Sequence, residues 1–277
     1  MRARRRIVHP SAFLLLTVTT GAALGAGCLR ANPPPPWVAG QPVTAWSARA
    51  TAASVPSSAV GGVIPADPLA AFTNLQERLL AAKTVDIAVE IESGAPYPSL
   101  LTGTLALAAG NQLALSLDGQ FKGDSVNLRL RAQPNGKLVG GAHGDGDATV
   151  DVPTPAKLNE AVVVGMLGMG LLHNAALLVF GMPPDHAAGG AAEWVVTSGH
   201  TWDTGRDATV NGVAARALTF QIAVEGHQVG DATLWLDATT GLPVKREVNV
   251  HFSGEGDGDA AGTMHVRETY LKFVVTP

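Results

Sequence analysis

The sequence is poor in cysteine, in aromatic residues and in clustered positive charge. Its single cysteine, Cys28, cannot form an internal disulfide. Aromatic residues make up 5% of the chain, the net charge is −4, and the lysines and arginines are scattered, so we expect no nucleic-acid partner. No Gly-x-Ser-x-Gly, His-Glu-x-x-His or phosphate-binding glycine motif occurs. We therefore expect no catalytic residue, no cofactor and no metal.

What the sequence does contain is a long series of alternating apolar and polar residues between Val85 and Val275. The first run, from Val85 to Ile91, is typical of the others. Side chains of a strand point to opposite faces with period two, so each run predicts a strand with one apolar side and one polar side. Turn signals such as Gly110-Asn111 and Asp118-Gly119 separate the runs and favour an antiparallel meander.

Two segments have a helical pattern. Asp67 is a typical N-cap followed by Pro68 at the first helical position, and Leu69, Phe72, Leu75 and Leu79 recur on one face, with Leu80 beside them. The second segment covers about 156–182. Together with the alternating runs, this predicts a mainly β (α+β) fold. We expect an unclosed antiparallel β-barrel of about 10–11 strands with an N-terminal helix and an apolar lid helix insert.

The second helical segment has few polar side chains. From Ala161 to Met182 these are only His173 and Asn174, so the segment is either a lid or a membrane span. Its glycines, its central polar pair and the lack of flanking basic residues argue against a span. A crossing would also put two halves of one sheet on opposite sides of the membrane. We expect a lid that is broken near Gly170–Asn174.

The N-terminal residues have the pattern of an export signal. Arg2 and Arg4 to Arg6 precede an apolar run that ends shortly before Cys28. This cysteine resembles the lipid-modified first residue of bacterial lipoproteins, whose acyl groups include palmitate. An ordinary signal cut with an unmodified thiol is the alternative. Residues 1–27 are then a signal peptide, 28–66 a disordered Pro/Ala/Ser-rich tether after the lipidated cysteine, and 67–277 the folded domain.

The order of these elements resembles the LolA/LolB-like superfamily of periplasmic lipoprotein and lipid carriers, which includes envelope-stress sensors. The strand–turn–strand from Leu234 to Val244 resembles its recurrent motif, as does the helix that runs into a strand between Phe72 and Val89. The resemblance implies an unclosed barrel around an apolar cavity that holds acyl chains. It also implies a location in the periplasm or cell envelope. Leu29, rather than an aspartate, follows Cys28, and the resemblance to lipoproteins of the double-membrane type then implies anchoring by lipid to the outer membrane.

The resemblance and the alternation together suggest a binding site. We predict that leucines of the apolar face line a hydrophobic cavity, although the same pattern fits a filled core. These are Leu105, Leu107, Leu115, Leu128, Leu130, Leu234 and Leu236. We predict that the lid contributes Leu167, Leu171, Leu172, Leu178 and Phe180. No polar cluster is evident on the apolar face, which argues against an enzyme.

Two hypotheses of function follow. In the first, an anchored lipoprotein binds acyl chains of a lipid or lipoprotein for transport or outer-membrane insertion, and its partners are those chains and the membrane. In the second, a regulatory or structural lipoprotein uses the same fold to bind an envelope protein. His251 and His265 could also face each other across a hairpin, but two imidazoles without a third ligand do not make a metal site.

Overall fold

The computed structural model describes residues 64–143, 148–179, 195–224, 227–252 and 262–277. Cys28 and Phe180 lie outside these ranges. The helices are α1 (Pro68–Leu80), α2 (Leu158–Gly168) and α3 (Leu171–Val179), with a short 3-10 turn, η2 (Thr204–Arg206). The strands are β1 (Thr84–Ser93), β2 (Ser99–Ala108), β3 (Gln112–Phe121), β4 (Asp124–Ala132), β5 (Lys137–His143), β6 (Ala148–Pro153), β7 (Val195–Trp202), β8 (Ala208–Val210), β9 (Val213–Val224), β10 (His227–Asp237), β11 (Pro243–Phe252) and β12 (Gly262–Thr276).

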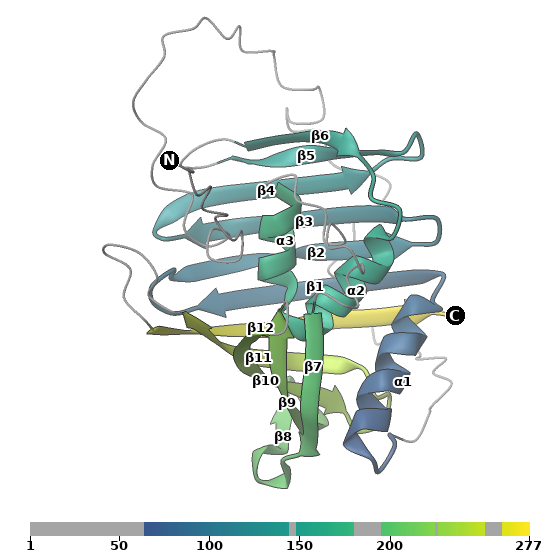
Figure 1. Cartoon of the computed structure of the whole chain (residues 1–277), viewed down its shortest axis with the longest axis vertical. Helices are drawn as coiled ribbons and strands as arrows, with labels where there is room; N and C mark the ends of the chain where they lie inside the picture. The colour runs from purple at the N-terminus through teal and green to yellow at the C-terminus, as the bar shows by residue number, and fades with distance from the viewer. Residues whose placement is uncertain (1–63, 144–147, 180–194, 225–226, 253–261) are drawn as a thin grey trace, which may run out of the picture. The chain divides into compact units, whose positions relative to one another are not determined.

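All twelve strands belong to one antiparallel sheet (Figure 1). Its order is β6-β5-β4-β3-β2-β1-β12-β11-β10-β9-β7, and β8 pairs with β9. The pairing of β1 with β12 joins two meanders, one on each side of the helical insert. The path ends at β6 and β7, which do not pair with each other, so the predicted unclosed sheet is confirmed. The sheet has slightly more strands than expected because β6 and β8 are short.

The predicted alternation places one face of the sheet in the core. In β1, Val85, Ile87, Val89 and Ile91 are all buried, while Glu90 and Glu92 are exposed. The same period holds across β2, β3 and β4, where the register joins Leu105 to Leu115 and Leu115 to Leu130. Residues paired across strands share a face, so these leucines form one apolar row.

Helix α1 begins as predicted. Asp67 accepts a hydrogen bond from the Ala70 backbone N–H at 2.9 Å, and Pro68 follows it at the first position. Two residues of the predicted apolar face, Leu69 and Leu80, are instead 55% and 42% exposed. The buried stripe is Ala71, Phe72, Leu75 and Leu79. Compared with the predicted face, the buried stripe is rotated around the helix axis toward Ala71. Both exposed leucines therefore lie beyond the opposite edge of the stripe.

The insert forms two helices that lie across the apolar face of the sheet (Figure 1). Helix α2 contacts α1, β3 and β7, whereas α3 contacts β5 and β6. The segment breaks at Met169-Gly170, at the start of the predicted region, where Gly170 has a φ of +95°. Within the described residues, neither of these helices nor α1 is long and apolar enough to cross a membrane. We call α2 and α3 together the lid.

Candidate ligand site under the lid

The seven predicted wall leucines are all buried, with exposed fractions of 0% to 8%. Five of them lie on the neighbouring strands β2, β3 and β4. Leu234 and Leu236 lie on β10, beyond β1, β12 and β11 in the sheet order. The structure therefore brings the predicted wall together in two groups, with three strands between them.

The predicted lid residues that the structure describes are buried or half-buried as well. Leu167, Leu171 and Leu178 are 1–2% exposed and Leu172 is half-buried. Every residue from 161 to 170 is buried, so α2 has no polar face along that stretch. A helix that is apolar all round must be covered on all sides. Here α1, β7, α3 and the sheet supply that cover.

A polar row crosses the middle of the apolar face, which corrects the expectation that no polar cluster lies there. Arg246 on β11 pairs in register with Leu234 on one side and with Glu268 on the other. Both charged residues are 0% exposed, and Tyr270, two residues after Glu268, is also buried. Buried charges are rare unless they have partners, so Arg246 and Glu268 are expected to have partners nearby.

The contacts of the polar row converge on residues 168–171, which we call the elbow of the lid. Arg246 Nη2 donates a hydrogen bond to the Gly168 carbonyl oxygen at the end of α2. Glu268 Oε1 accepts hydrogen bonds from the backbone N–H groups of Leu171, at 2.6 Å, and Leu172, at 3.4 Å, at the start of α3. Each charge thus meets the helix end of opposite polarity, which is the favourable arrangement.

The elbow approaches the polar row closely enough to require glycine. A Cβ atom on Gly170 would lie 2.5 Å from Arg246 Nη1 and 2.7 Å from Glu268 Oε1. The positive φ of this residue also disfavours a side chain. Gly170 therefore permits both the sharp break in the lid and its contact with the charged pair.

Two neighbouring groups have pKa values shifted by this environment. Burial, and next the Glu268 carboxylate, raise the pKa of Tyr270 well above its usual range, so its hydroxyl stays protonated and donates to Glu268 Oε2 at 2.9 Å. Burial lowers the pKa of His173 on α3 to about 4, and the charge of Arg246 acts in the same direction. His173 is therefore neutral at neutral pH.

Some buried polar atoms at the site have no hydrogen-bond partner among the described residues. They are Nε and Nη1 of Arg246 and Oδ1 of Asn174. The amide nitrogen of Asn174 is bonded, because it donates to the Gly170 carbonyl at 2.7 Å. An unpaired buried donor costs free energy, so these two nitrogens of Arg246 have hydrogen-bonding capacity that a water molecule or a ligand can satisfy.

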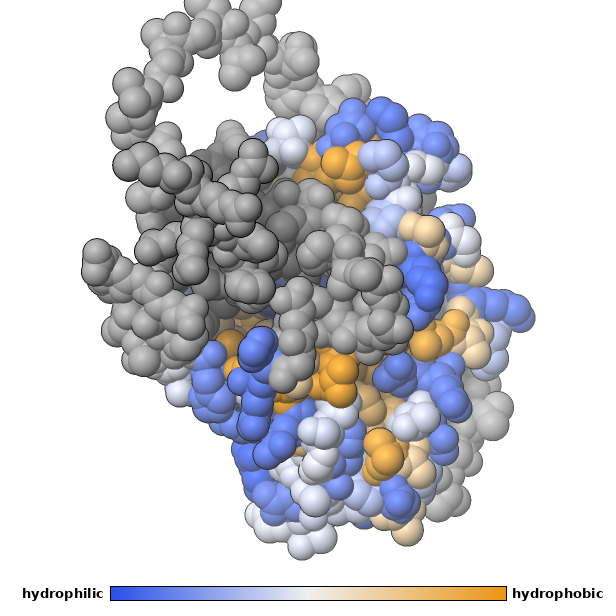
Figure 2. Space-filling model, viewed as in Figure 1, coloured by the Kyte–Doolittle hydropathy of each residue, from blue (hydrophilic) through white to orange (hydrophobic). Residues whose placement is uncertain are grey.

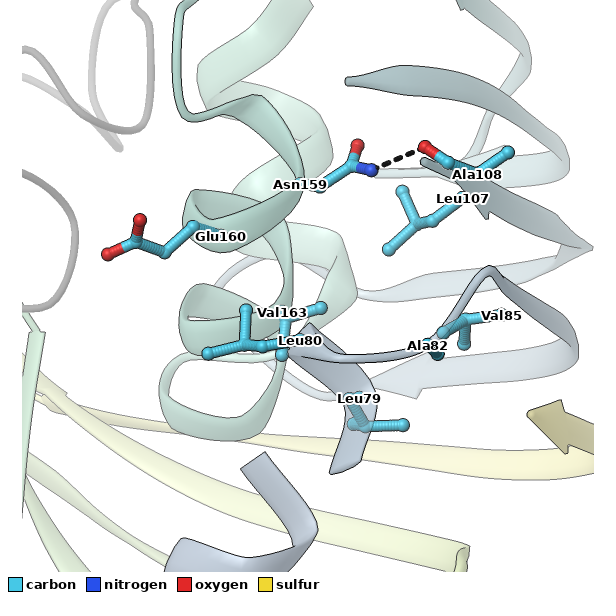
Figure 3. Close-up of a pocket in the computed structure, with 9 residues that line it drawn as sticks. All are labelled: Leu79, Leu80, Ala82, Val85, Leu107, Ala108, Asn159, Glu160 and Val163. Carbon is cyan, nitrogen blue, oxygen red and sulfur yellow. Dashed lines mark hydrogen bonds between the residues drawn. The ribbon is translucent and has the colours of Figure 1, made fainter. Parts of the chain in front are cut away.

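Small pockets lie at the margins of the lid. One of about 230 Å³ lies between α1, α2 and the β1–β2 hairpin (Figure 3). Its walls include Leu79, Leu107 and Val163; Asn159 donates to the Ala108 carbonyl at 2.6 Å, and Glu160 points away from it. A second, of about 150 Å³, lies between α1, α2 and β7. Sites for drug-sized ligands hold about 300–1,000 Å³, so neither pocket takes a long ligand with the lid in place.

The register shows that His251 and His265 do not face each other, and packing accounts for His200. His251 pairs with Thr263, and His265 pairs with Asn249, so the two imidazoles are not opposite each other. His200, next to the small residues Ser198 and Gly199, lies against Phe72 and Phe220, with ring centroids 4.7 Å and 5.5 Å away. It is part of the packing between α1 and the sheet.

Sequence comparison matches the chain to no family model and to no curated protein. Among solved structures, it is similar to a chain of the MucA/MucB complex of Pseudomonas aeruginosa (15% identity, TM-score 0.33, covering 76% of this chain and 59% of that chain). It is also similar to a LolA superfamily protein from Nitrosomonas europaea (8%, 0.22, 76% and 93%) and to a β-barrel-like protein from Brucella abortus (10%, 0.29, 71% and 100%).

The chain spans about three fifths of the length of the matched chain in the MucA/MucB complex, and about as much of the chain in a crystal structure of MucB.

Proposed function

We propose that the domain binds acyl chains of a lipid or lipoprotein on the apolar face of its sheet, in the space that the lid occupies. The observation that carries this proposal is the lid itself. It is an apolar, glycine-jointed pair of helices that lies over the apolar face of the sheet, and its elbow is held by a few polar contacts. The role would be transport or outer-membrane insertion in the cell envelope, with the lipid on Cys28 as the anchor.

Hydrocarbon burial alone supplies enough free energy for such a ligand. Each buried CH₂ contributes about 0.8 kcal/mol, so a chain of a dozen methylenes gives on the order of 10 kcal/mol before ordering costs. The wall needs no specific polar contact with the chain itself. Moving the lid exposes its own apolar side chains, which can then cover the far side of the bound chain.

The lid is well suited to be the moving element. Gly165, Gly168 and Gly170 lower its intrinsic helix stability. Gly165 also lets α2 and α3 pack closely, because a Cβ atom there would overlap the side-chain amide of Asn174. The lid can therefore move as a unit about its connection to β6.

A disulfide between the lid and β7 tests this function directly. A Cβ on Gly168 would lie 3.7 Å from Val195 Cβ, close to the mean separation in disulfides of about 3.8 Å. We would prepare full-length chain with Cys28→Ser, Gly168→Cys and Val195→Cys, and measure uptake of a fluorescent fatty acid, with lipid extraction and native mass spectrometry. We expect no uptake in the oxidised protein and full uptake after reduction.

The control is the chain with Cys28→Ser and Val195→Cys only, which leaves Gly168 in place and should take up the probe in both redox states. Equal uptake by the oxidised and reduced double-cysteine chains would show that the lid does not gate the site. A control chain that takes up no acyl probe and carries no lipid would contradict the proposal as a whole.

A partner-binding regulator is the second hypothesis, and a large apolar patch outside the site would favour it. On the face viewed in Figure 2, apolar residues form separate patches among polar ones. In the part of the chain that the structure describes, the large exposed hydrophobic residues come from four different elements: Leu69, Leu80, Leu100, Val196, Leu271 and Val274. Scattered apolar side chains are normal on a protein surface, so the acyl-binding function is the better supported.

A further inference from the structure

The side chains of the polar row are hydrogen-bonded to backbone groups of the elbow, and a ligand that displaces the elbow must supply groups of the same kind. In the elbow, a carbonyl oxygen meets Arg246 and two N–H groups meet Glu268. An occupant that displaces the elbow has to offer an acceptor to the guanidinium and a donor to the carboxylate. Without them, the ligand leaves charges buried and unpaired, which is unfavourable.

Common acyl ligands meet only part of this requirement. A hydrocarbon chain offers neither group, and an ester offers an acceptor without a donor. A free carboxylate offers acceptors but brings negative charge beside Glu268. Because Tyr270 already donates to Glu268 Oε2, the oxygen left for a ligand is Oε1, the same oxygen that accepts from Leu171.

We infer that the ligand is an N-acyl amphiphile, with an amide joining its acyl chain to its polar part. The amide carbonyl takes the place of Gly168 O on Arg246, and the amide N–H takes the place of Leu171 N–H on Glu268. The hydrocarbon then lies along the leucine wall on either side of the polar row. This inference rests on the proposed function and specifies the class of molecule that the same site accepts.

The unpaired nitrogens of Arg246 add a second requirement. Nε and Nη1 are buried and have no partner among the described residues while the elbow is in place. A ligand with further acceptor oxygens beside its amide pairs these donors, which the elbow does not do. Such a ligand gains hydrogen bonds when it displaces the lid. Sugar hydroxyls of an N-acyl glycolipid and carbonyls of an N-acylated peptide share this chemistry.

The test compares matched ligands on the full-length chain carrying Cys28→Ser. The probes are N-palmitoylglycine methyl ester, the analogue with an ester oxygen in place of the amide N–H, and palmitate, each titrated by calorimetry. Loss of a hydrogen bond to a charged group weakens binding by about tenfold or more, so we expect the amide to bind about tenfold or more tightly than the ester. Palmitate should bind more weakly than the amide as well.

Two variants test whether Glu268 is the source of the preference for the amide over the ester. Glu268→Gln should bring the amide and the ester toward equal affinity, whereas Glu92→Gln, at an exposed carboxylate on β1, should keep the preference. Equal binding of the amide and the ester by the chain with Glu268 intact overturns the inference and leaves acyl binding standing. If none of the three probes binds, the proposed function itself fails.

The source of the amide is distinguished by two further probes. N-palmitoylglucosamine and an N-palmitoyl dipeptide carry the same chain and amide with different acceptor oxygens. A tighter fit of the sugar supports the inference and indicates a glycolipid, and a tighter fit of the dipeptide supports it and indicates an acylated protein terminus. Binding of both more weakly than the simple ester overturns it.

Discussion

At the scale of single residues, the apolar face depends on a few polar side chains inside it. Arg246 and Glu268 lie next to each other across β11 and β12, and each is directed to one end of a lid helix. The pair holds the elbow from both sides, because Arg246 bonds to the end of α2 and Glu268 bonds to the start of α3. Small changes at the elbow should therefore have large effects.

Gly170→Ala tests that dependence. The new methyl group would overlap Arg246 Nη1 and Glu268 Oε1 and would also hold an unfavourable φ of +95°. We expect a loss of about 2 kcal/mol or more in the free energy of unfolding, measured with urea. Gly110→Ala, with a φ of +80° and no atom near its Cβ, should lose only about 1 kcal/mol. Equal losses would show that the contact with the polar row contributes nothing.

His173 predicts a pH dependence of stability. Its pKa is about 4 in the folded chain against 6.5 as the ordinary value, so the unfolded chain binds the proton more tightly. The contribution of neutral His173 to the free energy of unfolding is therefore fully present above about pH 6.5. It falls by roughly 3 kcal/mol in all as the pH decreases toward 4, and it levels off below that. Urea unfolding of His173→Gln across this window should lack that part of the loss. An identical pH profile for the variant would exclude His173 as its cause.

At the scale of elements, the lid and the sheet should respond differently to a ligand. The N–H groups of Leu171 and Leu172 bond to Glu268, whereas that of Lys83 bonds to Thr276 O beside the β1–β12 pair. If an acyl ligand displaces the elbow, the first two amides should exchange faster with solvent, and the Lys83 amide should not change. Hydrogen exchange with mass spectrometry, with and without a bound acyl probe, measures both. Unchanged exchange at Leu171 and Leu172 would mean that the elbow stays in place.

At the scale of the whole molecule, the sequence predicts the fold better than the site. The strands were predictable because the alternation of Val85, Ile87 and Val89 has the period of a strand, and α1 because Asp67 and Pro68 mark its start. The pairing of β1 with β12 was not predictable from the sequence, because strands that are far apart in the chain carry no local signal of their register. The leucine wall follows from period two alone.

The polar row was missed for a physical reason. Arg246 shares its side of β11 with Val248 and Val250, and Glu268 shares its side of β12 with Val266. Charged residues at such positions are easily assigned to solvent, since an unpaired charge is costly in a core. Only the three-dimensional register, which puts both under the elbow, shows what pairs with them.

The pairing of β1 with β12 sets the order in which the sheet can be completed. The first meander, β1 to β6, comes first along the chain, and one side of β1 stays unoccupied until β12 is available. An unpaired strand edge invites pairing with other chains. Early folding of the first half is therefore a hazard, and a molecular chaperone that delays it until the whole domain is available would protect this protein more than one whose meanders close independently.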